Sequence, residues 1–159
     1  MNKAIFLDRD GVINFERGFT FKLEDFEILP DVFEVLKNFQ KKGYLLIVIS
    51  NQSGIGKDLY TQADVELIHK YMLNELKKNK IQLQEIYYCV HHPDSGKCLC
   101  RKPDALFVEK AIARFNIDAK RSFFIGDKER DVEAGEKCGV KGILIEANTS
   151  LKLIEHLIE

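Results

Sequence analysis

The sequence predicts an α/β protein whose three layers enclose a doubly wound, Rossmann-like parallel sheet. Five short apolar runs have the length of buried strands, at residues 4–7, 44–49, 86–90, 122–127 and 142–145. Stretches with apolar residues at helical spacing lie between these runs. Strands that alternate with helices form right-handed crossovers, so the helices are expected to cover both faces of a parallel sheet.

The helices carry start and stop signals. The segment 30–43 opens with Pro30-Asp31 and closes at Gly43, and Thr61 with Asp64 makes a capping box for a long helix that ends near residue 80. Pro103-Asp104 is expected to begin a third helix. Two further helices are predicted over residues 131–138 and 150–157, and residues 13–29 are expected to form an ordered flap.

The inward face of the long helix is predicted from its apolar spacing. His69 on the same helix is expected to be a surface or packing residue rather than a metal ligand. The residues expected to face the core are Val65, Ile68, Tyr71, Met72 and Leu76.

Length and charge limit the class of protein. The 159 residues suit a single domain over 1–159, and 24 basic against 25 acidic side chains give a net charge of −1, which does not favour a nucleic-acid partner. No apolar run approaches the ~20 residues of a membrane span, and no signal peptide is recognisable. We therefore expect a cytoplasmic monomer that has no membrane partner.

Polar side chains follow four of the predicted strands. The carboxyl ends of parallel strands share one edge of the sheet, so these side chains are expected to meet in one crevice. For Asp8 and Asp10 taken alone, the alternative is that they are solvated acids at a strand end before a glycine turn. The residues are Asp8 and Asp10, then Ser50 and Asn51, then Arg101 and Lys102, and finally Asp127 with Asp131.

These residue types suit phosphoryl transfer. Asp8 and Asp127 offer the oxygen ligands that Mg²⁺ prefers, while Ser50 and Lys102 would neutralise phosphate oxygens near the transition state. Asp8 would attack phosphorus and form an aspartyl-phosphate. Asp10 would protonate the leaving oxygen and then activate the hydrolytic water. The loop of Asn51, Gln52, Ser53 and Gly54 offers amide, hydroxyl and backbone N–H donors to an oxyanion.

A second metal site is predicted in the loop at residues 89–102. Cys89-x-His91 is followed by Cys98-x-Cys100, which supplies three thiolates and one imidazole for a closed, structural zinc site that fixes Arg101 and Lys102. His92 is the alternative imidazole, and a chance cluster of cysteines is the alternative to a site. Cys138 is expected to be a buried core thiol.

The motifs DRDGV, SNQSG, RKP and GDKERD resemble, in this order and along nearly the whole chain, those of the haloacid-dehalogenase-like (HAD) phosphohydrolase superfamily. The resemblance implies the HAD fold, with Asp8 as nucleophile and magnesium ligand and Asp10 as acid and base. It also implies that the Asp10 backbone carbonyl and Asp127 bind magnesium, that Asp131 supports Asp127, and that Ser50 and Lys102 hold the phosphoryl group.

Within the superfamily, the zinc loop resembles two families. FLDRDGVIN, EDFEIL, YYCVHHP and CLCRKP are similar to the heptose 1,7-bisphosphate 7-phosphatases of bacterial lipopolysaccharide and cell-surface heptose synthesis. The short spacing from His91 to Cys98 is nearer to the histidinol-phosphate phosphatases. An alternative from another functional class is a metal-binding interaction module without catalytic activity.

The chain has no inserted cap domain, so other segments are expected to select the substrate. The flap at Glu16, Arg17, Gly18 and Phe19 and the loop at Ser53 are the expected specificity elements. By resemblance, Arg101 and Lys128 would reach the polar groups or second phosphate of a phosphorylated sugar, and a bisphosphate would also favour Arg17.

Overall fold

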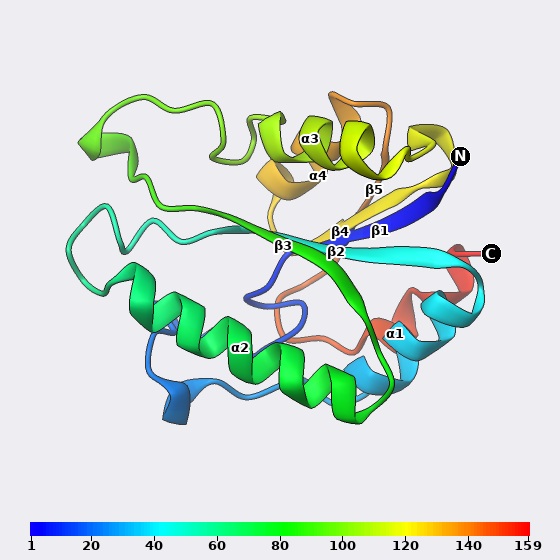
Figure 1. Cartoon of the computed structure of the whole chain (residues 1–159), viewed down its shortest axis with the longest axis horizontal. Coiled ribbons are helices and arrows are strands. Elements are labelled where there is room, and N and C mark those ends of the chain that lie inside the picture. The colour runs from blue at the N-terminus through cyan, green and yellow to red at the C-terminus, as the bar shows by residue number, and fades with distance from the viewer.

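The computed structural model describes residues 1–159 and has a parallel sheet at its centre (Figure 1). The five strands lie in the order β3-β2-β1-β4-β5, and every neighbouring pair is parallel. This arrangement confirms the predicted fold class. The strands are β1 (Lys3–Leu7), β2 (Tyr44–Asn51), β3 (Leu83–Cys89), β4 (Phe123–Gly126) and β5 (Lys141–Leu144).

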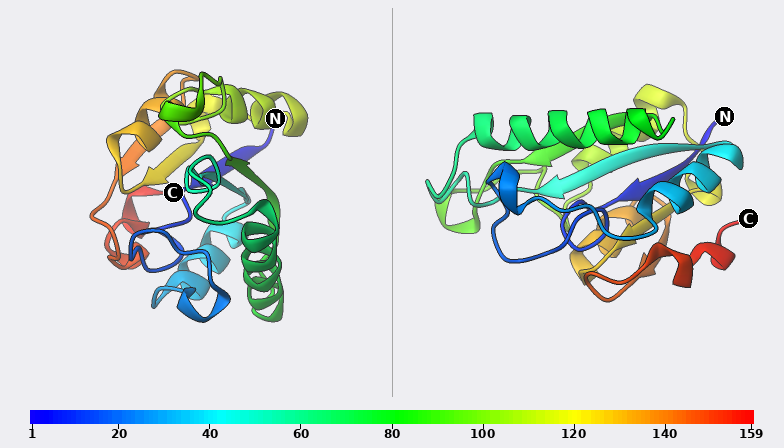
Figure 2. Two further views of the ribbon diagram at one scale, coloured as in Figure 1. Left: turned by 90° about the vertical axis from the view of Figure 1, so that its left-hand side faces the viewer. Right: turned by 90° about the horizontal axis from the view of Figure 1, so that it is seen from below.

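Helices cover both faces of the sheet, as Figures 1 and 2 show. On one face lie α1 (Val32–Lys41) and α2 (Gln62–Lys78), and on the other lie α3 (Leu106–Phe115) and α4 (Glu129–Glu136). Alternation along β1 serves both layers: Ile5 and Leu7 join the core beneath α1 and α2, and Phe6 joins the core beneath α3 and α4. No helix combines the length and the apolar character that crossing a bilayer requires.

The strand order reverses at β1. The chain passes from β1 to β2 to β3 in one direction and then crosses to the other side of β1 for β4 and β5. The carboxyl ends of β1 and β4 therefore border the point at which such sheets open a ligand crevice. In Figure 1 the loops that follow β2 and β3 extend to the end of the molecule opposite both termini, and the loop that directly follows β1 lies nearer the middle.

The C-terminal segment differs from the helix predicted over 150–157. It forms two short 3₁₀ turns, Leu151–Leu153 and Glu155–Leu157. Leu151 and Ile158 are buried while the leucines between them are exposed, so the segment has no continuous apolar stripe with which a helix could pack. It is tied to α1 instead, by a bond from the Asn38 amide to Glu155 (2.8 Å).

Two helices begin elsewhere than predicted. Helix α3 begins at Leu106, after a turn over residues 101–104, rather than at Pro103. Helix α4 begins at Glu129 rather than Asp131, because the Asp131 carboxylate accepts a bond from the backbone N–H of Lys128 (3.1 Å) and so caps the first turn. Cys138, predicted to be buried, is half-buried against the core beneath α3 and α4.

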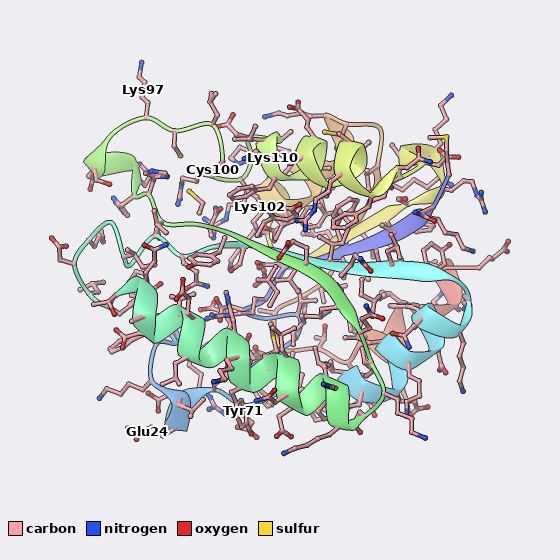
Figure 3. The ribbon with its side chains drawn as sticks, in the orientation of Figure 1. Glu24, Tyr71, Lys97, Cys100, Lys102 and Lys110 are labelled. Carbon is pink, nitrogen blue, oxygen red and sulfur yellow. The ribbon has the colours of Figure 1, made fainter.

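The inward face of α2 is largely as predicted, with Val65, Ile68, Met72 and Leu76 buried. Tyr71 is an exception: it is 38% exposed, and Figure 3 shows it at the outer side of the helix. His69 takes the inner position instead. Its ring packs edge-on against Tyr88, and its Nε2 lies 3.3 Å from the buried guanidinium of Arg9. The packing role predicted for His69 is confirmed.

The flap contains one 3₁₀ turn, Leu23–Asp25, and is held at three points. Arg9 donates to the carbonyl of Thr20 (3.1 Å), and the Phe21 ring stacks on Tyr60 at a centroid distance of 5.2 Å. The Asn148 side chain accepts from the backbone N–H of Glu16 and donates to its carbonyl (2.6 and 3.2 Å). The flap is therefore an ordered wall beside the ends of β1 and β4.

Candidate active site

A buried ion-pair cluster lies at the carboxyl ends of β1 and β4. The Lys102 ammonium is 2.9 Å from Asp8 and 2.7 Å from Asp131, and it donates to the carbonyl of Ile49 at 2.7 Å. Burial by itself would lower the pKa of Lys102, but the two carboxylates outweigh burial and raise it. Lys102 is therefore a fixed positive charge beside Asp8.

The carboxylates beside this lysine are arranged as for a divalent cation. Ligand oxygens of Asp8, Asp127 and Asp131 lie within 4.8 Å of one another. Both oxygens of Asp127 are buried without a hydrogen-bond partner, and burial raises the pKa of Asp127 and of Asp8, the latter to about 8. An unpartnered buried carboxylate is unfavourable unless a cation compensates it, so these oxygen donors fit Mg²⁺.

Asp10 is oriented by a separate set of donors. Its Oδ1 accepts from Arg9 (2.8 Å) and from the amide of Asn14 (2.9 Å), and its Oδ2 accepts from Gln52 (3.0 Å). Arg9 is fully buried, and its other amino group faces His69. The Asp10 side chain is thus held apart from the carboxylate cluster, while still facing the cavity beside it.

The loop after β2 is fastened to both neighbours. Asn51 exchanges two bonds with the backbone of Lys102, at 3.1 and 3.0 Å, and the N–H of Gln52 donates to the Cys89 carbonyl at 2.8 Å. The Gln52 side chain accepts from Tyr60 and donates to the buried hydroxyl of Ser50. This network fixes the donors that face the cavity.

A cavity of about 270 Å³ opens in front of these groups. Ser50 and Lys102 do not line it, because both are buried behind Asp8 and the loop. Three lining residues were not singled out from the sequence: Thr20, Tyr60 and Arg130. The predicted residues that do line it are Asp8, Asp10, Glu16, Gly18, Phe19, Asn51, Gln52, Ser53, Asp127 and Lys128.

Two predicted substrate cations lie outside the cavity. Arg17 is exposed, forms an ion pair with Glu27 and lies over the ring of Phe15. Arg101 lies on the segment between β3 and α3, with one amino group buried and without a partner. Of the four flap residues predicted to select the substrate, three line the cavity: Glu16, Gly18 and Phe19.

The predicted zinc ligands form a compact cluster. The Cys89 sulfur is 3.1 Å from that of Cys100, 3.8 Å from that of Cys98 and 3.3 Å from Nδ1 of His91. Sulfurs bound to tetrahedral Zn²⁺ lie about 3.8 Å apart, so the donor set fits zinc. His92 stands outside the cluster, because its Nδ1 accepts from the N–H of Asp94 (3.1 Å). Figure 3 shows Cys100 and Lys102 on the same segment between β3 and α3.

The fold and this site define a phosphatase of the haloacid-dehalogenase-like class, and residues 99–153 match the family described as HAD-hydrolase-like. A Helicobacter pylori (strain J99) D-glycero-beta-D-manno-heptose-1,7-bisphosphate 7-phosphatase is 43% identical over 152 residues, which is 95% of this chain and 87% of that protein. A Campylobacter jejuni D-glycero-alpha-D-manno-heptose-1,7-bisphosphate 7-phosphatase is 42% identical over 94% of this chain and 85% of its own. The chain belongs to the D-glycero-D-manno-heptose-1,7-bisphosphate 7-phosphatase family.

Solved structures agree with this membership. The crystal structure of a D,D-heptose 1,7-bisphosphate phosphatase from B. bronchiseptica, complexed with magnesium and phosphate, superposes with a TM-score of 0.85 at 28% identity, over 97% of this chain and 86% of that one. The crystal structure of a protein from Mesorhizobium loti, described as a putative HAD-like phosphatase, gives a TM-score of 0.83 at 26% identity, over 90% of this chain and 72% of that one. The chain is therefore a phosphoric monoester hydrolase and not a silent metal-binding module.

Proposed function

We propose that this chain hydrolyses the 7-phosphate of D-glycero-D-manno-heptose 1,7-bisphosphate and leaves the 1-phosphate in place. The observation that carries the proposal is the pairing of Asp8 with Lys102 at 2.9 Å, next to the unpartnered carboxylate of Asp127. Relatives that cover nearly the whole chain are named for this substrate. The names of these relatives specify the beta anomer in one case and the alpha anomer in the other, so the proposal covers both anomers of the substrate.

In the first step, Asp8 attacks phosphorus and the bond to the sugar oxygen breaks, which leaves an aspartyl-phosphate. Lys102, 2.9 Å from Asp8, supplies positive charge next to the phosphoryl group as negative charge accumulates on it. The buried Ser50 hydroxyl acts through Gln52, which donates to it (2.9 Å) and lines the cavity. Asp8, Asp127 and the Asp10 backbone carbonyl would hold magnesium, which would supply further neutralising charge, and Asp131 keeps Lys102 in place (2.7 Å).

Asp10 carries the proton in both steps. Its carboxyl protonates the departing sugar oxygen, and the resulting carboxylate then takes a proton from the water that hydrolyses the aspartyl-phosphate. This role needs a side chain that faces the cavity in one fixed orientation. Arg9, Asn14 and Gln52 supply that orientation.

Histidinol phosphate is the less favoured substrate. Its amine would require an acidic contact from the flap, and the flap acid that lines the cavity is Glu16. The Glu16 carboxylate already accepts from the backbone N–H of Gly18 (2.9 Å). Eight relatives at 36–43% identity carry the heptose name, so the short zinc loop does not by itself indicate the histidinol enzyme.

We test the substrate by measuring phosphate release from heptose 1,7-bisphosphate and from histidinol phosphate in parallel, with excess magnesium. The bisphosphate is expected to have the higher kcat/KM, and Asp8→Asn is expected to reduce its turnover to background while the fold is retained. Faster turnover of histidinol phosphate would reject the substrate. Persistent activity of Asp8→Asn, confirmed as folded by circular dichroism, would reject the nucleophile.

We further infer that residues 1–159 act as one cytoplasmic, monomeric domain. Support comes from the cluster of three cysteines, since free thiols that bind a metal persist in a reducing compartment. Light scattering of the purified protein checks the monomer. A mass of twice 18.3 kDa would contradict it.

A further inference from the structure

A sugar bisphosphate brings two dianions into one cavity. The phosphate being transferred lies against Asp8, where Lys102 is already shared between two carboxylates. The second phosphate, at the other end of the sugar, would lie away from Asp8 in a cavity whose lining acids include Glu16 and Asp127. Cations that face the cavity are therefore required to hold the second phosphate against this negative charge.

Only two basic side chains line the cavity, and they are Lys128 and Arg130. Both belong to the start of α4, where Lys128 is the N-cap and Arg130 is the second residue of the helix. The Lys128 ammonium lies 3.9 Å from Asp127, so it is a weak partner of the acidic cluster. Arg130 is not in any ion pair of the protein.

Arg130 combines an unpartnered buried N–H with a position in the cavity lining, whereas Arg101, which also has a buried group without a partner, lies outside the cavity. The Arg9 guanidinium contacts Asp10, His69 and the Thr20 carbonyl, and Arg17 forms an ion pair with Glu27. The Nε of Arg130, in contrast, is buried and has no hydrogen-bond partner. Burying a polar group without a hydrogen-bond partner is unfavourable. A ligand with acceptor oxygens in the cavity would remove this cost.

We propose that Arg130, with Lys128 beside it, binds the second phosphate and gives the enzyme its preference for bisphosphates over monophosphates. The proposal rests on the function proposed above. A guanidinium suits this position, because its planar set of N–H donors can pair with two oxygens of one phosphate. Arg130 then replaces Arg17 and Arg101, the cations expected from the sequence, which lie outside the cavity.

The test compares Arg130→Gln with the unsubstituted enzyme on two pairs of substrates: heptose 1,7-bisphosphate with heptose 7-phosphate, and fructose 1,6-bisphosphate with fructose 6-phosphate. The ratio of kcat/KM for bisphosphate to that for monophosphate is expected to fall about 10- to 100-fold, mainly through KM for the bisphosphate. Arg130→Lys is expected to restore part of the ratio. Arg114→Gln, which removes an exposed arginine that pairs with Glu85 on the outer surface, is the matched control.

Each outcome decides between the proposals. An equal loss on both members of a pair would show that Arg130 serves the transferred phosphate or the fold, and no loss would show that it does not bind the second phosphate; either result overturns the inference. Another result would be that the unsubstituted enzyme fails to hydrolyse heptose bisphosphate and yet prefers fructose 1,6-bisphosphate to fructose 6-phosphate in a way that depends on Arg130. That result would support the phosphate subsite and reject the proposed substrate. If the unsubstituted enzyme prefers no bisphosphate, the subsite fails even though phosphatase activity remains.

Discussion

Gly11 shows how closely the backbone approaches the predicted magnesium ligands. Its φ is +86°, and a Cβ placed on it would lie 2.5 Å from Oδ2 of Asp127. Real Cβ contacts do not approach this closely, so a larger residue must displace the carboxylate. The left-handed backbone adds about 1–2 kcal/mol of strain for a non-glycine residue. The glycine of DRDGV is thus required by space as well as by the turn.

Gly11→Ala is therefore expected to weaken magnesium binding about 10- to 100-fold, the usual effect of disturbing a metal ligand through its neighbour. The measurement is the magnesium concentration that gives half-maximal phosphate release. Gly43→Ala is the matched control, because Gly43 has the same backbone region (φ +87°) but its Cβ would have nothing nearer than 3.8 Å. An unchanged magnesium requirement in Gly11→Ala, with the protein folded, would contradict the role of Asp127.

Site residues that directly follow strands were predictable, and those placed by loops were not. Asp8 and Asp127 follow β1 and β4, whose register fixes their distance once the sheet forms. Tyr60 and Arg130 gave no such signal. Tyr60 reaches the cavity because the flap folds back and stacks on it, and Arg130 because α4 begins two residues earlier than its apolar pattern indicates. The position of Arg17 outside the cavity likewise depends on the path of the flap, which the sequence does not indicate.

The loop between β3 and α3 braces the site through both of its ends. Cys89 accepts from the backbone of Gln52 at one end, and Lys102 exchanges two bonds with Asn51 at the other. In its middle, the backbone of His92 is so close to Gly56 that a Cβ on Gly56 would lie 2.6 Å away. Closing the Cys/His cluster around a metal therefore also fixes the loop after β2.

Cys98→Ser is expected to lose zinc, to unfold at a lower temperature and to lose about 10- to 100-fold in activity, because Lys102 and Gln52 lose their support. Elemental analysis, thermal unfolding and phosphate release measure the three effects. Cys138→Ser serves as the control, since this thiol lies outside the cluster. Full activity in a zinc-free Cys98→Ser preparation would show that the loop needs no metal.

The elements themselves were largely predictable, whereas several ends were not. All five strands and the capping box of α2 match the sequence patterns. The strands β1, β2 and β4 are largely buried apolar runs between turns, whereas β3 and β5, at the two edges of the sheet, are only partly buried. The exceptions arise from tertiary contacts. His69 lies on the inner face of α2, where it contacts Arg9 and Tyr88, while Tyr71 is exposed. The last residues form 3₁₀ turns that contact α1.

The two apolar cores share one sheet and should melt together. Neighbouring residues of β1 alternate between them, so neither layer of helices can detach without exposing side chains of the central strand. We expect residues 1–159 to unfold in urea in a single cooperative transition. Far-UV circular dichroism and tyrosine fluorescence, used to monitor the unfolding, should give the same transition. Two separate transitions would contradict the single domain.

The free energy of unfolding should also fall in mild acid because of His69. Burial, with the charge of Arg9 next, lowers the pKa of His69 to about 3, whereas in the unfolded chain it is near its ordinary value of 6.5. Between these values the unfolded chain binds a proton that the folded one excludes, so this contribution favours unfolding increasingly as the pH falls from 6.5 towards 3. It amounts to about 2 kcal/mol between pH 7 and pH 5.

His69→Gln keeps an acceptor for Arg9 but cannot titrate, so it is expected to lose that part of the decrease in the free energy of unfolding. The decrease is measured from urea midpoints at the two pH values. An identical decrease in both proteins would show that His69 is protonated in the folded state, or that Arg9 does not hold it neutral.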